Sequence, residues 1–263
     1  MTDPEIENTL VKRKLEAIQK LGDLRDERAV PTLLAVLNDT VFGVKRLQAA
    51  NKPVLRQEAA QALAKIGGAG AETTLSGLLN HPDAGERQLA ADALASGAGS
   101  AAIAALLDRL KKEKDPAVKF KIITSLGKVG GAAGSAAERA VVAGELIALM
   151  QNSVGDIKLA SITALGHLKL DTATAPLLKE LRSWMSIAPL VEAIVRALGE
   201  IGDPTAVDDL SLMLASHRSV AAREQAAVAL GAIGDAKALA ALRKALTTEK
   251  SPAVRAIISK FVP

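Results

Sequence analysis

The chain of 263 residues contains no cysteine and no tyrosine, and aromatic residues make up only 2% of it. Without cysteine there is neither a disulfide framework nor thiol chemistry, and nothing indicates an oxidising compartment. Single-stranded nucleic acids are usually bound by stacking on aromatic side chains, of which the chain offers almost none. A formal charge of +4 is weak support for any polyanionic partner. Nucleic acid is therefore disfavoured as a ligand.

Long apolar runs and a targeting segment are also missing. No apolar stretch approaches the ~20 residues that a membrane-spanning helix needs. The first residues, Met1 to Glu5, are acidic and polar, which is unlike a signal peptide. We therefore expect a soluble, cytoplasmic protein with no membrane span.

Residues suited to catalysis or metal binding are scattered. The three histidines, His81, His167 and His217, lie far apart, and none belongs to a His-Glu-x-x-His pattern. The glycine-rich stretches at 67–70 and 130–134 lack the Lys-Ser/Thr ending of a phosphate-binding loop. We predict no catalytic residues, no metal and no cofactor.

What the chain does contain is a repeated phrase. Residues 197–203 read Ala-Leu-Gly-Glu-Ile-Gly-Asp, residues 229–235 read Ala-Leu-Gly-Ala-Ile-Gly-Asp, and weaker copies run along the whole chain. The sixth position of the phrase falls at residues 22, 67, 98, 130, 169, 202 and 234. Repeats of roughly 30 residues or more are typical of stacked, quasi-one-dimensional proteins. The pattern predicts one elongated domain over residues 1–263.

Each repeat reads as two helices. Before the sixth position, apolar residues recur at helical spacing, as at Ala222, Ala226 and Leu230, and after it a second such stripe begins. Glycine at the sixth position fits the left-handed conformation that ends a helix. Lys169 and Ala98 stand there in two repeats, so we expect those turns to differ. No stretch alternates for long enough to be a strand, and the fold class is all-α.

The repeated pattern has the form Val/Leu-Arg, then Ala-Ala-x-Ala-Leu-Gly-x-Ile-Gly-Asp, then a leucine-rich helix. It resembles the HEAT repeat, most of all the short variety named after phycobilisome (PBS) lyases, and residues 223–235 match almost in full. The resemblance covers nearly the whole chain. It implies an α-solenoid, a right-handed superhelix of about seven HEAT-like helix pairs, whose arginine-bearing helices line a concave groove. It does not fix function, because such repeats occur in scaffolds, adaptors, chromophore-handling proteins and enzymes.

Two steps of the repeat are long, which indicates loop insertions near residues 40–53 and 131–139. Insertions in such arrays map to one edge and often contact partners, although neutral decoration is an equal alternative. Phe42 in the first insertion and Trp184, the only tryptophan, are candidate anchors for a partner. Trp184 could equally fill space beneath a long connection.

A cation recurs eleven positions before the sixth position of most repeats. These residues, the basic row, are Arg56, Arg87, Lys119, Lys158, Arg223 and Arg255. One interpretation is structural: each pairs with a carbonyl or an aspartate of the preceding turn, such as Asp83, Asp115 or Asp156. The other is a basic stripe that steers an acidic partner. The sequence leaves both open.

One position further on, most repeats carry a polar residue, but Phe120 and Leu159 stand there in two neighbouring repeats, with Leu89 nearby. If these helices line a groove, its middle is apolar with Lys121 and His167 as polar neighbours, which is typical of a binding site. The alternative is that these side chains are buried between layers.

The sequence therefore favours a non-catalytic scaffold or adaptor that binds a protein or peptide partner along its groove. A phycobilin lyase-like or chromophore-handling protein is the one enzyme alternative, and a nucleic-acid-binding repeat protein is the third. Ile257 and Val262 of the last, incomplete repeat are expected to be exposed, which suggests a homodimer through the C-terminal layer.

Overall fold

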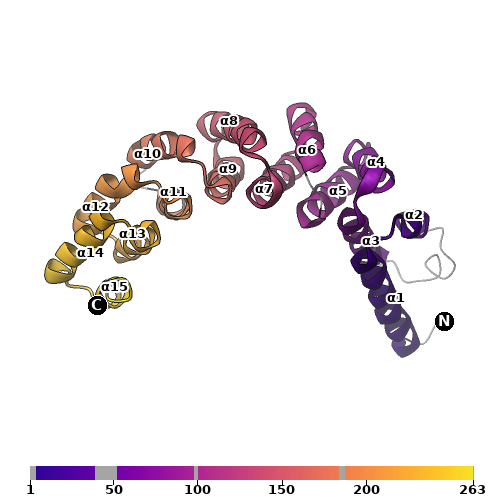
Figure 1. Cartoon of the computed structure of the whole chain (residues 1–263), viewed down its shortest axis with the longest axis horizontal. Coiled ribbons are helices and arrows are strands. Elements are labelled where there is room, and N and C mark those ends of the chain that lie inside the picture. The colour runs from indigo at the N-terminus through magenta and orange to yellow at the C-terminus, as the bar shows by residue number, and fades with distance from the viewer. Residues whose placement is uncertain (1–3, 39–51, 98–99, 184–186, 263) are drawn as a thin grey trace. The chain divides into compact units, whose positions relative to one another are not determined.

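The computed structural model describes residues 4–38, 52–97, 100–183 and 187–262, and its regular elements within these ranges are all helices. The helices form two compact units, residues 1–134 and 135–263. In each unit the helices alternate between two rows (Figure 1). The predicted all-α solenoid of stacked helix pairs is confirmed.

In unit 1 the odd-numbered helices pack one against the next, and each even-numbered helix packs on the odd helix that follows it. The elements are α1 (Pro4–Leu24), the 3-10 turn η1 (Glu27–Ala29), α2 (Val30–Leu37), α3 (Lys52–Ile66), α4 (Gly68–Leu79), α5 (Ala84–Gly97), α6 (Ser100–Lys112) and α7 (Pro116–Ala133).

Unit 2 repeats the arrangement, with α9, α11, α13 and α15 in the odd row. Its elements are α8 (Ala136–Asn152), α9 (Gly155–Leu168), η2 (Asp171–Ala173), α10 (Thr174–Ser183), α11 (Ala188–Ile201), η3 (Pro204–Ala206), α12 (Val207–Ser216), α13 (Val220–Ile233), α14 (Ala236–Thr248) and α15 (Pro252–Ile258).

The core of each unit is the aliphatic layer between its two rows. Leu55 and Leu63 of α3, Ile122 of α7 and Leu198 of α11 are fully buried. Burying such a side chain contributes about 1.5–3 kcal/mol. A repeat of this size cannot bury enough apolar surface alone, so the neighbouring repeats must supply the rest.

The glycine at the third position of the phrase allows neighbouring odd helices to approach closely. A Cβ added at Gly199 would lie 2.9 Å from the Cα of Ala229 on the next odd helix, and one at Gly166 would lie 2.9 Å from the Cα of Ala197. The partner in both cases is the alanine that opens the next copy of the phrase. The small residues therefore set the spacing of the odd row.

The left-handed turn predicted at the sixth position is present at Gly202 and Gly234. The prediction was wrong at Gly130, which lies inside α7, and at Gly67, whose φ of 67° is combined with a ψ of −158°. Our expectation of a different turn at Lys169 was wrong, because Lys169 adopts the same left-handed conformation, with φ 51° and ψ 49°. A side chain in this region costs roughly 1–2 kcal/mol. The surrounding helices impose the turn although the residue is not glycine. Ala98 lies outside the described residues.

The register of the first repeat also needs correction. Gly22, assigned to the sixth position from the sequence, instead makes the close approach of a third-position glycine, to Ala62 of α3. The left-handed residue is Arg25, three positions later, with φ 51°. Asp26 then caps η1 as Asp203 caps η3. The first copy of the phrase is therefore shifted by one helical turn.

The extra residues near 131–139 lengthen helices rather than form a loop. α7 continues to Ala133 and α8 begins at Ala136, so that only Gly134 and Ser135 connect them. Ser135 and Glu138 form a capping box, which defines the start of α8. The boundary between the two units falls at this connection, and a single domain over 1–263 stays a prediction. Of the other insertion, residues 39–51, including Phe42, lie outside the described part.

We expect Gly199→Ala to lower the free energy of unfolding by about 1–3 kcal/mol, because the new methyl group would meet the Ala229 backbone and push α11 from α13. Gly144→Ala is the matched control, because Gly144 is an exposed position of α8 and no atom lies within 4 Å of its added Cβ. It should stabilise by about 0.5–1 kcal/mol. Urea unfolding measures both; equal effects would contradict the close packing.

Candidate binding surface

Side chains at three positions, spaced by four residues, share one accessible face on α3, α5 and α7 of unit 1 and on α9, α11 and α13 of unit 2. In unit 1 none of the nine is buried, and we call them the open face of unit 1. They are Gln57, Gln61, Lys65, Gln88, Asp92, Ser96, Phe120, Thr124 and Lys128. The corresponding open face of unit 2 consists of Leu159, Thr163, His167, Glu192, Arg196, Glu200, Glu224, Val228 and Ala232. A residue and its i+4 neighbour lie on the same side of a helix.

Ion pairs between adjacent odd helices cross or border these faces. Lys65 Nζ lies 2.9 Å from Asp23 Oδ1, and Lys121 Nζ lies 3.1 Å from Asp92 Oδ1. His167 Nε2 is 3.9 Å from Glu200 Oε2, a contact that is ionic only when the imidazole is protonated. Exposed pairs of this kind are worth about 0–1 kcal/mol. They fill the faces with satisfied charge rather than contribute much stability.

The apolar residues predicted to line the groove, Leu89, Phe120 and Leu159, differ in how exposed their side chains are. Phe120 of α7 is 41% exposed, so the alternative of a core side chain does not describe it. Leu89 of α5 and Leu159 of α9 are half-buried. Leu89 and Phe120 lie with Lys121 on the neighbouring helices α5 and α7 of unit 1, whereas Leu159 and His167 belong to unit 2.

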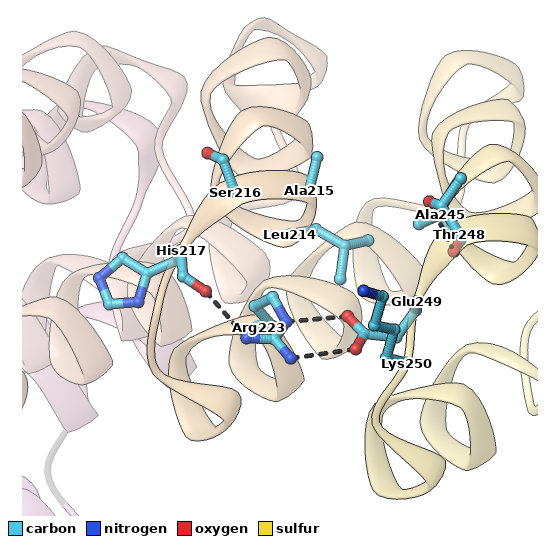
Figure 2. Close-up of a pocket in the computed structure, with 9 residues that line it drawn as sticks. All are labelled: Leu214, Ala215, Ser216, His217, Arg223, Ala245, Thr248, Glu249 and Lys250. Carbon is cyan, nitrogen blue, oxygen red and sulfur yellow. Dashed lines mark hydrogen bonds and ion pairs between the residues drawn. The ribbon is translucent and has the colours of Figure 1, made fainter.

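Two arginines of the basic row make closely similar contacts, and Arg87 has one additional carbonyl partner. Arg87 donates to Glu113 from Nε (2.8 Å) and Nη2 (3.1 Å), and from Nη1 to the carbonyl oxygens of His81 and Pro82. Arg223 donates to Glu249 at 2.8 and 3.0 Å and to the His217 carbonyl at 2.9 Å, as Figure 2 shows. Each arginine therefore ties the loop before its own helix to the loop that follows the next even helix.

The other members of the basic row vary. Arg56 pairs with Glu86 and Lys158 with Glu180, while Arg255 donates to the Leu246 carbonyl. Lys119 is half-buried, and no ion pair joins it to another residue in the described part of the chain.

The carboxylates of these pairs are glutamates, not the aspartates that the sequence interpretation named. Asp115 accepts from the amides of Ala117 and Val118 and so caps α7. Sequence reasoning missed Glu113 and Glu249, although the sequence contains a signal for them. Each glutamate lies 26 residues after the arginine with which it pairs, Arg87 or Arg223. Spacing alone does not show which acid turns toward the arginine.

The Glu113 carboxylate is the most enclosed charge of these pairs, with a side chain only 1% exposed. Burial alone would raise its pKa, but hydrogen bonds from Arg87, Arg109 and the amides of Asp115 and Lys114 outweigh burial and lower the pKa from 4.5 to about 2. The ionised form is therefore strongly favoured in the folded protein.

The last layer differs from expectation. Val262 is 1% exposed, not exposed as predicted, and Phe261 packs against Gly231 of α13. Ile257 is half-buried. The tail after α15 folds back to cover part of the apolar edge that the sequence suggested for a homodimer.

Trp184, like Phe42, lies outside the described residues. In the described part of the chain, no group of three or more His, Cys, Asp or Glu side chains is placed to hold a metal ion. Nor does any described helix combine the length and apolarity needed to cross a bilayer.

A carboxyl group whose pKa is lower in the folded than in the unfolded protein stabilises the fold at pH values above its unfolded pKa. This stabilisation is lost as the pH falls toward the folded pKa. Glu113 should therefore contribute most to stability above pH 4.5. Wild type is expected to exceed Glu113→Gln in free energy of unfolding at pH 6. That excess should shrink by about 3 kcal/mol as the pH falls to 2 and below. Urea unfolding of both proteins across this range measures it, and a pH-independent difference would contradict the assignment.

Comparison with known proteins agrees with this architecture. The HEAT repeats family matches residues 43–127, 71–142 and 188–259, and the PBS lyase HEAT-like repeat matches residues 14–39. No significant match was found among curated protein sequences.

Solved structures similar to the chain include an engineered protein, with 22% identity and a TM-score of 0.51 over 98% of this chain and 74% of that one. Human deoxyhypusine hydroxylase in complex with glycerol shows 20% identity and a TM-score of 0.40 over 92% and 97% of the two chains. The complex of CpcE and CpcF of phycocyanin lyase from Nostoc sp. shows 21% identity and a TM-score of 0.33 over 100% and 96%. At 22% identity, the likeness to the engineered protein concerns the fold alone. The family matches cover more than half of the sequence, and the chain belongs to the HEAT-repeat proteins.

Proposed function

We propose that this protein is a non-catalytic scaffold or adaptor that binds a segment of a partner protein on the open faces of its odd helices. The observation that carries the proposal is Phe120, a large apolar side chain 41% exposed on a face whose other members are polar. Exposed apolar residues with a polar rim are typical of interaction sites.

The surroundings of Phe120 suit a polypeptide. The carboxamides of Gln57, Gln61 and Gln88 and the hydroxyl of Thr124 share its face. The carboxamides can both donate and accept hydrogen bonds, as a peptide backbone requires, while the Thr124 hydroxyl, which donates to the Lys121 carbonyl, can still accept one. Leu89 on the adjacent helix α5 offers a second apolar contact.

Charge plays the smaller part in this proposal. Arg87, Lys158 and Arg223 are already paired with glutamates inside the chain. An acidic partner would therefore find few free cations in the basic row. Apolar contact would supply most of the affinity, while exposed charges such as Lys128 and Arg196 would affect association rates.

The two units serve the proposal separately. Leu159 and Val228 give the open face of unit 2 its own apolar positions, so that neither face depends on the other. A homodimer through the C-terminal layer would rest on Ile257 alone, because Val262 is buried. An enzymatic or chromophore-handling role stays open, and a bilin-induced absorption change on mixing would reveal the latter.

Phe120→Glu should abolish capture of the specific partner, because it places a charge where the apolar contact forms. The free energy of unfolding should change by no more than about 0.5 kcal/mol, as for other exposed sites. Val141→Glu, on an exposed position of the even-row helix α8, is the matched control. It should retain the partner.

Affinity capture from the native host with quantitative mass spectrometry, followed by calorimetry with the identified partner, compares wild type and both variants. Unfolding of Phe120→Glu would show that the residue supports the core. Capture of the same proteins by wild type and Phe120→Glu would contradict the proposed surface.

A further inference from the structure

The helix pairs α5–α6 and α13–α14 are related by a constant shift in numbering. α13 begins 136 residues after α5 (220 − 84), and α14 begins 136 residues after α6 (236 − 100). Glu249, which follows α14, likewise lies 136 residues after Glu113, which follows α6 (249 − 113). The same shift relates His81 to His217 and Arg87 to Arg223. The two sites can therefore be compared atom by atom, and unit 1 serves as a template for unit 2.

In unit 1 the Glu113 carboxylate is saturated with donors. Oε1 accepts from Arg87 Nη2 and from the amides of Lys114 and Asp115. Oε2 accepts from Arg87 Nε at 2.8 Å and from Arg109 Nε at 2.9 Å, and Arg109 Nη2 also lies 2.9 Å from it. Two guanidinium groups thus share one buried carboxylate.

In unit 2 the second guanidinium is missing, because the residue equivalent to Arg109 is Ala245 (109 + 136 = 245). Glu249 Oε1 accepts from Arg223 Nη2 and the Ser251 amide, and the Lys250 amide also donates to this carboxylate. Within the described residues, the one side-chain hydrogen bond to Oε2 comes from Arg223 Nε at 2.8 Å. The acceptor direction that Arg109 occupies in unit 1 is left open on Oε2.

A cavity of about 330 Å³ lies at this carboxylate, between the C-terminal ends of α12 and α14 (Figure 2). Ala245 and Thr248 line it from α14, and Ser216 and His217 line it from the end of α12. The Glu249 side chain is only 6% exposed. Hydrogen bonds from Arg223 lower its pKa, which keeps the carboxylate ionised at neutral pH.

We propose that this cavity binds the guanidinium group of an arginine side chain presented by a partner protein, with Glu249 Oε2 as its acceptor. The site takes arginine rather than lysine because the template contact in unit 1 uses two guanidinium nitrogens on one oxygen.

The positive charges around the cavity do not exclude a second guanidinium. Arg223 and Lys250 border the cavity, and in unit 1 Arg87, the counterpart of Arg223, donates to the same Glu113 oxygen as Arg109 does. The proposal rests on this comparison and not on the open faces, so it stands or falls separately from the function proposed above.

The probe is N-acetyl-arginine-methylamide, followed by methyl NMR of Ala245 and Leu214 and by calorimetry. Wild type should show saturable shifts of both methyl groups with one site per chain. The citrulline analogue, which has the same shape without the charge, should bind at least about tenfold more weakly.

Two variants identify the site. Ala245→Arg should fill the cavity from within the chain, raise the melting temperature and remove binding of the probe. Arg109→Ala should open the equivalent cavity at Glu113 and raise the stoichiometry from one to two. Absence of saturable shifts in wild type, equal binding of the citrulline analogue, or unchanged binding by folded Ala245→Arg would each overturn the proposal.

Discussion

The buried arginine–glutamate pair between successive layers is the interaction on which this structure depends. An odd-row arginine reaches back to the carbonyls of the loop before its helix and forward to a glutamate in the loop after the next even helix. Leaving either charge alone in such a setting costs about 3–5 kcal/mol, so the two residues must be kept together. The pair therefore fixes where each loop lies relative to the helix beside it.

Small residues complete this arrangement along the odd row. Glycine at the third position of the phrase and alanine at its first bring neighbouring odd helices close together, as Gly199 and Ala229 do. With so few aromatic side chains, contact between layers comes from many close aliphatic contacts rather than from a few large ones. Side chains on the free side of the odd helices then face solvent, and that is where the proposed partner surface lies.

Periodicity was sufficient to predict the helices, their pairing and the stacked architecture, because these follow from the spacing of apolar residues. Periodicity failed where the backbone conformation differs from the one that the residue type favours. Lys169 takes the left-handed turn without being glycine, and Gly22 serves close packing although it sits in a phrase that resembles a turn. Packing against neighbouring helices determines the conformation at both positions, and a local sequence pattern carries no information about that packing.

The candidate surface was less predictable than the fold. Position in the repeat left the exposure of Phe120 open, because Leu159 at the same position of the next repeat is half-buried, and it did not predict the state of the basic row. An arginine at a fixed offset has the same sequence signal whether it faces solvent or a buried glutamate. The difference between Arg109 and Ala245 is visible in the sequence as well, yet its meaning depends on an oxygen of Glu249 that only coordinates reveal.

A double-mutant cycle on Arg223 and Glu249 tests the central claim most directly. Unfolding free energies of wild type, Arg223→Met, Glu249→Gln and the double variant give the coupling between the two side chains. A structural pair predicts a coupling of about 1.5–3 kcal/mol, with the double variant more stable than the sum of the single losses implies. A coupling near zero would show that the basic row does not hold the layers together.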